Sequence, residues 1–408
     1  MFESFKPHPA DPIFSLTPIF ERDPRAEKVN LSIGMYTNAA GEFPLLSAVK
    51  AAAEEINRAS SPSTYLPMAG HADYRRAVQI LLFGPDQHKR QAGQVSTIQT
   101  LGGTGALRIG ADILKRYFPQ SGVWVSDPTW DNHKAILRAA GLTIYRYPYF
   151  DPTTNSVDFE ALFDCLAGLP PHSIVLFHAC CHNPTGADLS PEQWDQIGGI
   201  ARMRKLIPFF DFAYQGFAKG IDEDAYPIRM MAKLGLSFLV ANSFSKNFGL
   251  YGERCGALSF VCSNQREAAL AQGEMESVVR SSYSNPPFHG AHIIAKVLLE
   301  PRLQALWRSN VEEMRLRIQD MRAALVGAVA RKGASSSFNH LLGQQGMFGY
   351  TGLSAKMVEE LREKFAVYLV DTGRLCFAGL NFANVEHVAD ALAQVIMAQG
   401  NKAWIPTT

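Results

Sequence analysis

The sequence predicts an α/β fold with a mostly parallel sheet, because short apolar runs alternate with longer helical patterns. Each run is nearly continuous in apolar residues, as strands are when helices cover both faces of their sheet. Between two runs, a helix is expected over residues 191–203, with Ser190 as its cap and Pro191 in its first turn. Such alternation is typical of parallel sheets. The four strand-like runs are 123–126, 173–177, 207–210 and 238–241.

The last third of the chain has a different pattern, which predicts a smaller α+β domain. Residues 311–332 are expected to form a long amphipathic helix, and residues 385–399 a final helix. Three short strands are expected at residues 347–350, 368–370 and 374–377.

Composition excludes several classes of protein. A chain of 408 residues predicts two domains rather than one. With 39 basic and 38 acidic residues, it has no broad basic field for nucleic acid or an anionic membrane. The apolar runs are too short to span a membrane, and the N-terminus lacks the apolar stretch of a signal peptide, so we expect a cytoplasmic protein. The six cysteines form no CxxC pair, so buried thiols and no metal site are expected.

Polar side chains follow the predicted strands at their carboxyl ends. In parallel sheets these ends meet at one edge, where ligands bind. We therefore expect a site there. Its candidate residues are His178, Asn183, Asp211, Tyr214, Ser243 and Lys246.

A glycine-rich turn, residues 102–105, opens a segment with helical spacing. Free N–H groups and the positive end of the helix dipole suit a phosphate there. The motif is neither of the common nucleotide-binding patterns, and a plain tight turn explains it equally well.

Lys246 comes directly after a buried-type strand, and Arg254 follows shortly after it. An ordinary surface lysine is the alternative. A lysine that forms a Schiff base must be nucleophilic, which desolvation and nearby cations favour. Ser243 and Arg254 would flank it as donors for a phosphate.

Asp211 ends another predicted strand, and Tyr214 follows it. A carboxylate beside a pyridine nitrogen keeps that nitrogen protonated, so that the ring can accept electrons. Tyr214 and Asn183 could hydrogen-bond a phenolate oxygen on such a ring. Taken singly, Asp211 is explained equally well as a capping aspartate, and Asn183 as an asparagine of a turn.

Taken together, these residues resemble the class I, fold-type I aminotransferases, in the branch that acts on aspartate and aromatic amino acids. The SFSK…GER stretch and the HNPTG stretch are together highly specific for this family. The matching stretches are residues 31–36, 65–67, 102–105, 126–133, 182–186, 211–216, 242–254, 280–287 and 373–374.

The resemblance implies pyridoxal 5'-phosphate as cofactor, with Lys246 as the Schiff-base lysine that also moves the substrate proton. Asp211 would pair with the pyridine nitrogen, and His133 would support it. Asn183 and Tyr214 would hold the phenolate oxygen. The implied catalytic residues are Lys246, Asp211 and Tyr214.

Phosphate binding is implied for Gly103, Thr104, Ser243 and Arg254. Tyr65 would reach the phosphate of the neighbouring subunit. The resemblance thus implies a homodimer with shared active sites.

For the substrate, the resemblance implies that Arg374 clamps the α-carboxylate with a bidentate fork, a task that lysine does poorly. Arg280 would meet the distal carboxylate in the other subunit's site. Gly34 would lie on a mobile lid. Trp130, whose alternative is a core aromatic, would stack on the cofactor and, like Asn183, contact substrate.

The resemblance also implies a domain plan and a seven-stranded sheet sandwiched by helices. The small domain would be built from both chain ends. The expected parts are an arm at 1–10, the small domain at 11–43 and 313–408, and the large cofactor-binding domain at 44–312.

Substrate preference depends on the entrance to the site. Met35 and Phe43, with Thr37, would line it, and the two apolar side chains favour aromatic substrates. We expect a ping-pong transfer from tyrosine or phenylalanine, and also aspartate, to 2-oxoglutarate. Aspartate aminotransferase is the alternative, which Thr104 favours. Ala179 stands where the aromatic branch often has proline.

Rival classes fit less well. A β-lyase or decarboxylase would not need two arginines, 280 and 374, for two carboxylates. A cofactor-binding regulator would need a DNA-binding module before the small domain. A dinucleotide-binding reading of residues 102–107 lacks the acidic residue that should follow a second strand.

Overall fold

The computed structural model describes residues 2, 5, 11–59, 64–334 and 338–398. The chain divides into two compact units, residues 1–43 with 317–408, and residues 44–316. The second boundary falls inside helix α11 (Pro301–Arg331), four residues after the expected position. Most of the expected arm at 1–10 lies outside the described residues.

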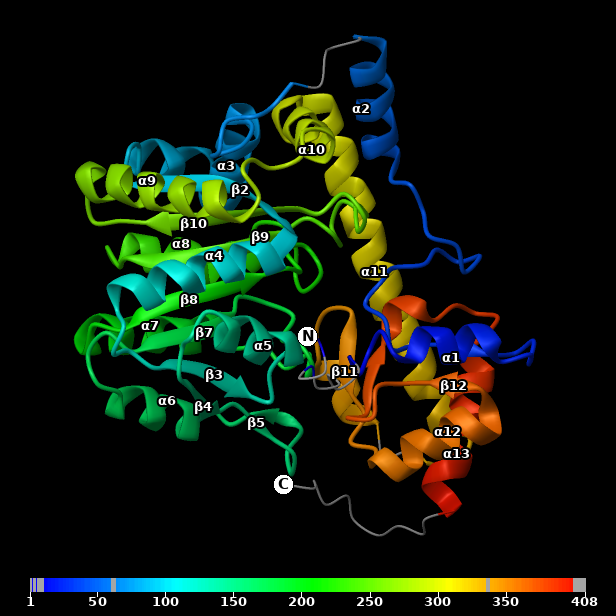
Figure 1. Ribbon diagram of the computed structural model, residues 1–408. Coiled ribbons are helices and arrows are strands. Elements are labelled where there is room, and N and C mark those ends of the chain that lie inside the picture. Colours follow the sequence, from blue (N-terminus) through cyan, green and yellow to red (C-terminus); the bar gives the residue numbers. More distant parts are fainter. Residues whose placement is uncertain (1, 3–4, 6–10, 60–63, 335–337, 399–408) are drawn as a thin grey trace. The chain divides into compact units, whose positions relative to one another are not determined.

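The larger unit is built on a seven-stranded sheet, which confirms the predicted α/β class (Figure 1). Only β10 runs antiparallel to its two neighbours, β2 and β9, while the other neighbouring strands are parallel. In spatial order the strands are β2 (Val95–Leu101), β10 (Cys255–Val261), β9 (Phe238–Ser243), β8 (Ile207–Phe212), β7 (Ile174–His178), β3 (Val123–Asp127) and β4 (Ile144–Pro148).

Helices cover both faces of this sheet (Figure 1). On one face lie α4 (Gly102–Tyr117), α5 (Asp131–Ala139) and α9 (Gln265–Ser282), whose apolar residues form one core with the strands. Ile109, Phe209 and Val279 are buried in that core. The other face is covered by α3 (Ala72–Arg90), α6 (Phe159–Gly168), α7 (Pro191–Arg204) and α8 (Tyr226–Lys233).

Both predicted features of α7 are present. The Ser190 hydroxyl accepts a hydrogen bond from the Gln193 backbone N–H, and the Gln193 side-chain Oε1 accepts one from the Ser190 backbone N–H. Pro191 is in the first turn. The unit also contains α2 (Ser47–Arg58), η1 (Glu223–Ala225), α10 (His289–Leu299) and a small β5–β6 hairpin (Phe150–Asp151, Ser156–Val157).

The smaller unit is of the α+β type. Its strands form two pairs: β1 (Val29–Asn30) runs parallel to β12 (Val367–Tyr368), and β11 (Phe348–Tyr350) runs antiparallel to β13 (Arg374–Cys376). Its other elements are α1 (Leu16–Arg22), η2 (Asn339–Gly343), α12 (Ala355–Phe365), η3 (Phe377–Gly379) and α13 (Val385–Ala398).

Most predicted elements differ from the structure by one or two residues at an end, and the largest difference is the start of a helix. Helix α11 begins at Pro301, well before the predicted start at residue 311, because proline suits the first turn of a helix and the helical pattern continues upstream. The final helix ends at Ala398 among the described residues, and the predicted last position, 399, lies outside them. No described helix has the length and apolar character that crossing a membrane requires.

Candidate active site

Three neighbouring strands of the large unit bring the predicted polar residues to one edge of the sheet. His178 at the end of β7 pairs in register with Asp211 of β8, and Asp211 pairs with Ala241 of β9. Ser243 is the last residue of β9, so Lys246 follows at the same edge. The parallel run of β7, β8 and β9 therefore places the candidates together.

Asp211 is a buried carboxylate with a fixed partner. His133 Nε2 lies 2.8 Å from Asp211 Oδ2, and His133 Nδ1 lies 2.9 Å from the Thr129 hydroxyl. Burial acts to raise the pKa of the Asp211 carboxyl, but the hydrogen bond to His133 and the positive charge of nearby Lys246 hold it below its usual value. Asp211 is therefore an anion that can face a cationic group.

Two further buried histidines continue from His133. The His178 ring lies 5.1 Å from the His133 ring and 4.4 Å from the His182 ring, between centroids. Burial lowers the pKa of His178 to about 3 and also lowers the pKa of His182, so both stay neutral. Neither ring nitrogen of His178 has a hydrogen-bond partner among the described residues.

Leaving a buried imidazole without a hydrogen-bond partner costs about 1–3 kcal/mol of folding free energy. This side of Asp211 is therefore suited to a further polar group, such as a bound molecule or water. The sequence singled out His178 only as the end of a strand, and no local motif marks it as part of this cluster.

Lys246 lies on the turn after β9 and faces an aromatic ring. Its Nζ is 4.9 Å from the centre of the Tyr214 ring. Asn183 Nδ2 donates to the Tyr214 hydroxyl at 3.5 Å, and both side chains are buried. An amine, a phenol and an amide thus lie near one another, with the phenol and the amide buried and the lysine half-buried. This is the set of groups expected around a phenolate oxygen.

The N-terminus of α4 forms a cradle with Ser243 and Arg254. Gly102 has φ of 67°, and a Cβ there would lie 2.7 Å from Arg254 Nη2. A Cβ on Gly103 would lie 3.0 Å from Ser243 Cβ. Only glycine lets the backbone approach these donors so closely.

The donors of this cradle suit a phosphate. Arg254 Nη1 donates to the Ser245 hydroxyl at 3.4 Å, and Ser243 and Ser245 hydroxyls lie 3.3 Å apart. A guanidinium, hydroxyls and a helix N-terminus together are the usual components of a phosphate site. Ser245 was missing from the prediction, although it stands inside the recognised SFSK stretch.

Trp130 precedes α5 as its cap residue, and its ring meets the His133 ring edge-on at 5.2 Å. Trp307 of α11 is a second tryptophan, which the sequence did not indicate. Its Nε1 donates to the Asn247 carbonyl at 2.7 Å, and its ring stacks on Phe248 at 4.8 Å. Trp307 therefore holds the turn that carries Lys246.

Tyr65 and Arg280, predicted to act in a second subunit, are exposed in this chain. Tyr65 is 92% exposed. Arg280 lies in the last turn of α9 and donates to the Ser284 hydroxyl at 2.6 Å. Both side chains are thus available to another molecule.

In the smaller unit, Arg374 is buried and oriented by its neighbours. Its Nη2 donates to the Ser32 carbonyl at 2.6 Å, and its guanidinium lies 4.2 Å from the centre of the Phe348 ring. A Cβ on Gly34 would lie 2.6 Å from Phe348 Cζ. Gly34, Phe348 and Arg374 therefore pack as one group. Phe348 was not predicted.

The residues of the large unit fit pyridoxal phosphate. A buried, ionised Asp211 held by a hydrogen bond to His133 suits a pyridinium nitrogen, and the α4 cradle suits the phosphate. Lys246 Nζ supplies the amine for the aldehyde carbon, with Tyr214 and Asn183 beside it for the phenolate oxygen.

Comparisons with known proteins give the same assignment. The family model of aminotransferase class I and II matches residues 26–392. The aromatic-amino-acid aminotransferase of Escherichia coli K12 is 52% identical over 97% of this chain and 100% of its own length. An aspartate aminotransferase of Pseudomonas aeruginosa is 47% identical over 97% of the chain and 100% of its own length.

Among solved structures, an aromatic-amino-acid aminotransferase of Burkholderia pseudomallei, covalently bound to pyridoxal phosphate, superposes with a TM-score of 0.94. It is 46% identical, and the match covers 97% of this chain and 99% of that one. Sequence, fold and site geometry lead to one conclusion: the chain belongs to the class I and II aminotransferases.

Proposed function

We propose that this protein is an aromatic-amino-acid aminotransferase. It transfers the amino group of tyrosine or phenylalanine, and also of aspartate, to 2-oxoglutarate by a ping-pong mechanism. The observation that carries the proposal is the set of groups around Lys246: a buried anion, an anion cradle and a phenol–amide pair. Aspartate aminotransferase is the second candidate, which Thr104 and the relative from P. aeruginosa favour.

The cofactor in this proposal is pyridoxal phosphate, as in the B. pseudomallei relative. Gly103, Thr104, Ser243 and Arg254 hold its phosphate, and the partner's Tyr65 adds a hydroxyl. Trp130 stacks on its ring. When bound, the cofactor supplies an electron-accepting ring that stabilises negative charge on the substrate Cα.

The side chains of the chain itself hold and move protons. The Asp211 carboxylate remains ionised beside His133, and its negative charge keeps a proton on the ring nitrogen of the cofactor that faces it. Lys246 Nζ would take the proton from the substrate Cα and return it to the C4′ carbon of the cofactor. Asn183 and Tyr214 hold the phenolate oxygen between them.

Substrate orientation depends on two arginines. Arg374, held by the Ser32 carbonyl and the Phe348 ring, receives the α-carboxylate in a bidentate fork. The partner subunit's Arg280 receives the distal carboxylate of aspartate or 2-oxoglutarate. Aromatic substrates leave that arginine unused and contact the entrance side chains, Met35 and Phe43.

The test is a steady-state comparison of kcat/KM for tyrosine, phenylalanine and aspartate, each with 2-oxoglutarate as acceptor. We expect both aromatic donors to be at least as good as aspartate. A kcat/KM for aspartate more than about tenfold higher, a difference of ~1.4 kcal/mol, would favour the second candidate. No turnover with any of the three would overturn both.

A further inference from the structure

One buried side chain connects two segments of the chain: the Tyr65 segment, residues 65–71, and the Arg280 segment, residues 280–288. Gln99 lies in β2 and is fully buried. Its Nε2 donates to the Pro287 carbonyl at 2.6 Å, and its Oε1 accepts from the His71 backbone N–H at 3.2 Å. Pro287 follows Arg280 shortly along the chain, and His71 follows Tyr65. A single amide therefore bridges the two segments.

The backbone on the Tyr65 side packs directly on Gln99. Gly70 has φ of 86°, and a Cβ there would lie 2.3 Å from Gln99 Cβ. The Gly70 N–H donates to the Pro67 carbonyl at 2.8 Å, and the Gln99 N–H donates to the Ala69 carbonyl at 2.9 Å. This turn leaves the stretch just after Tyr65 little freedom.

The Arg280 side is ordered by a second set of bonds. Arg280 donates to Ser284, whose backbone has φ of 70°, and the Asn285 N–H donates to the Tyr283 carbonyl at 2.8 Å. The chain then reaches Pro287, the acceptor of the Gln99 amide. The position of Arg280 is thus linked to Gln99 through a short, bent stretch.

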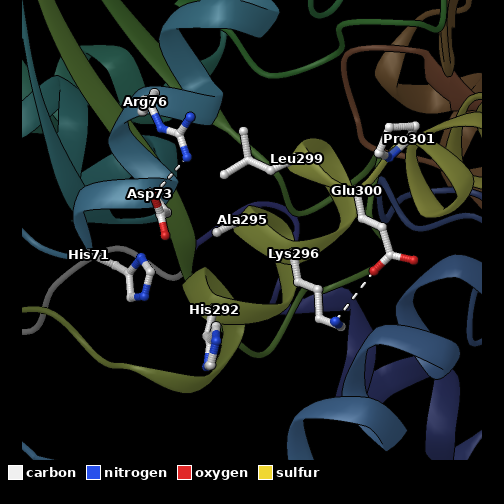
Figure 2. A pocket seen from close by; sticks show the side chains of 9 residues that line it. All are labelled: His71, Asp73, Arg76, His292, Ala295, Lys296, Leu299, Glu300 and Pro301. Carbon is white, nitrogen blue, oxygen red and sulfur yellow. Dashed lines mark hydrogen bonds and ion pairs between the residues drawn. The ribbon is translucent and has the colours of Figure 1, made fainter.

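A cluster of three rings joins the same two segments nearer the surface. The His71 and His292 rings stack with centroids 5.3 Å apart, and the Phe288 ring lies 6.1 Å from His71 and 4.9 Å from His292. Both imidazoles lie at the same end of a cavity of about 520 Å³ (Figure 2). The rings reinforce the link that Gln99 makes below them.

We propose that Gln99 is a positioning residue that holds Tyr65 and Arg280 as one unit for the active site of a second copy of this chain. The inference rests on the proposed function, in which both side chains act across a dimer. Gln99 touches neither substrate nor cofactor. Loosening it should weaken, together, the binding of the phosphate and of the distal carboxylate.

Gln99→Glu tests this proposal, because it keeps the shape and the acceptor for His71 but replaces the donor to Pro287 with a carboxylate oxygen. In the holoenzyme, KM for aspartate and 2-oxoglutarate should rise on the order of tenfold, with a smaller change for phenylalanine at saturating cofactor. The dissociation constant of pyridoxal phosphate from the apoenzyme should rise as well. Lower pH should reduce both defects, because a protonated carboxyl can donate to Pro287 again.

Gln79→Glu is the matched control. The Gln79 amide donates to the Val95 carbonyl at 3.2 Å and to the Thr97 hydroxyl at 3.0 Å, so the same change removes two donor bonds beside the same strand. Neither bond involves the Tyr65 or Arg280 segments. This variant should keep wild-type KM values and cofactor affinity.

Phe288→Leu is a milder second variant, which opens the ring cluster and should shift the same constants in the same direction. Wild-type KM values and cofactor affinity in both Gln99→Glu and Phe288→Leu would overturn this inference, and so would equal losses in Gln79→Glu. Either result would leave the proposed function standing. Absence of turnover in the wild-type enzyme would instead overturn the proposed function.

Discussion

At the scale of single residues, the site depends on a carboxylate that is buried and still ionised. Taking a charge out of water is costly unless it is paired and hydrogen-bonded. His133 supplies the hydrogen bond to Asp211, while Lys246 contributes positive charge nearby. The neutral His178 adds no full charge that would compete with a cationic ring nitrogen. The environment thus keeps Asp211 available for the cofactor.

Gly34→Ala should weaken substrate binding, because its effect passes from the Phe348 ring to the Arg374 guanidinium. The new methyl group would collide with the Phe348 ring, which packs on the Arg374 guanidinium. Displacing that ring should raise KM for every amino-acid substrate, by about 10-fold or more if one charge-assisted hydrogen bond is lost. Cofactor affinity should stay at the wild-type value. Gly343→Ala is the control, since a Cβ there meets no atom within 4 Å. A Gly34→Ala enzyme with unchanged KM would contradict the packing argument.

Much of this site could be predicted where its residues are close in the sequence. Ser243, Lys246 and Arg254 lie on one stretch, and a strand followed by a turn was enough to group them. Trp307 could not be found this way, because its partner Asn247 lies 60 residues earlier and an indole N–H to a carbonyl leaves no sequence pattern. Gln99 is hidden for the same reason, since it reaches Pro287 across 188 residues.

At the scale of elements, apolar runs predicted the strands β3, β7, β8 and β9 with small differences at their ends. These strands are covered on both faces, so nearly every position is apolar. Strands β2, β4 and β10 of the sheet were missed. Strands β2 and β10 contain buried Thr97, Thr100 and Ser259, whose hydroxyls bond to each other or to the backbone, and this polar content obscures the pattern. Strand β4 has exposed positions, so it is not a continuous apolar run.

The stacked imidazoles of His71 on the loop before α3 and His292 on α10 predict acid sensitivity of this packing. Burial lowers the pKa of the His292 imidazole. This pKa is lowered further by His71, Lys296 and His289, while the negative charge of Asp73 acts to raise it. Burial also lowers the pKa of His71, which faces Asp73 and Arg75. A histidine with a lowered folded-state pKa contributes stability above its unfolded pKa of about 6.5, and this contribution is lost as the pH falls below that value.

His292→Gln should therefore reduce the acid dependence of stability. Between pH 7.5 and 5.5, the Tm of the wild type should fall further than the Tm of the variant, by on the order of 1–2 °C. The other groups at this cavity, Arg76 and Glu300, are unchanged in the variant. The exposed His172, changed to Asn, is the control and should keep the wild-type difference. Parallel curves for His292→Gln and the wild type would contradict this account.

At the scale of the whole molecule, the proposed function requires residues of a second chain at each active site. Tyr65 is an almost fully exposed aromatic side chain, and Arg280 is an exposed cation, although the resemblance gives both a function at the cofactor and substrate. A two-fold dimer, in which the same surfaces meet, would bring each of these residues to the other chain's Lys246. Shared sites are therefore testable without any structure of the dimer.

Hybrid dimers provide that test. Lys246→Ala removes the proton-transferring amine, and Arg280→Leu removes the contact with a distal carboxylate, so each variant alone should have little aspartate activity. When the two variants are unfolded and then refolded together, hybrid dimers form. Each hybrid dimer has one site in which both residues are intact and one site in which both are replaced. Random pairing makes half of the dimers hybrids, so aspartate turnover should return to about a quarter of the wild-type value. Refolding each variant separately is the control. If Arg280 acted within its own chain, no hybrid site would be complete, and the mixture would stay as inactive as its components.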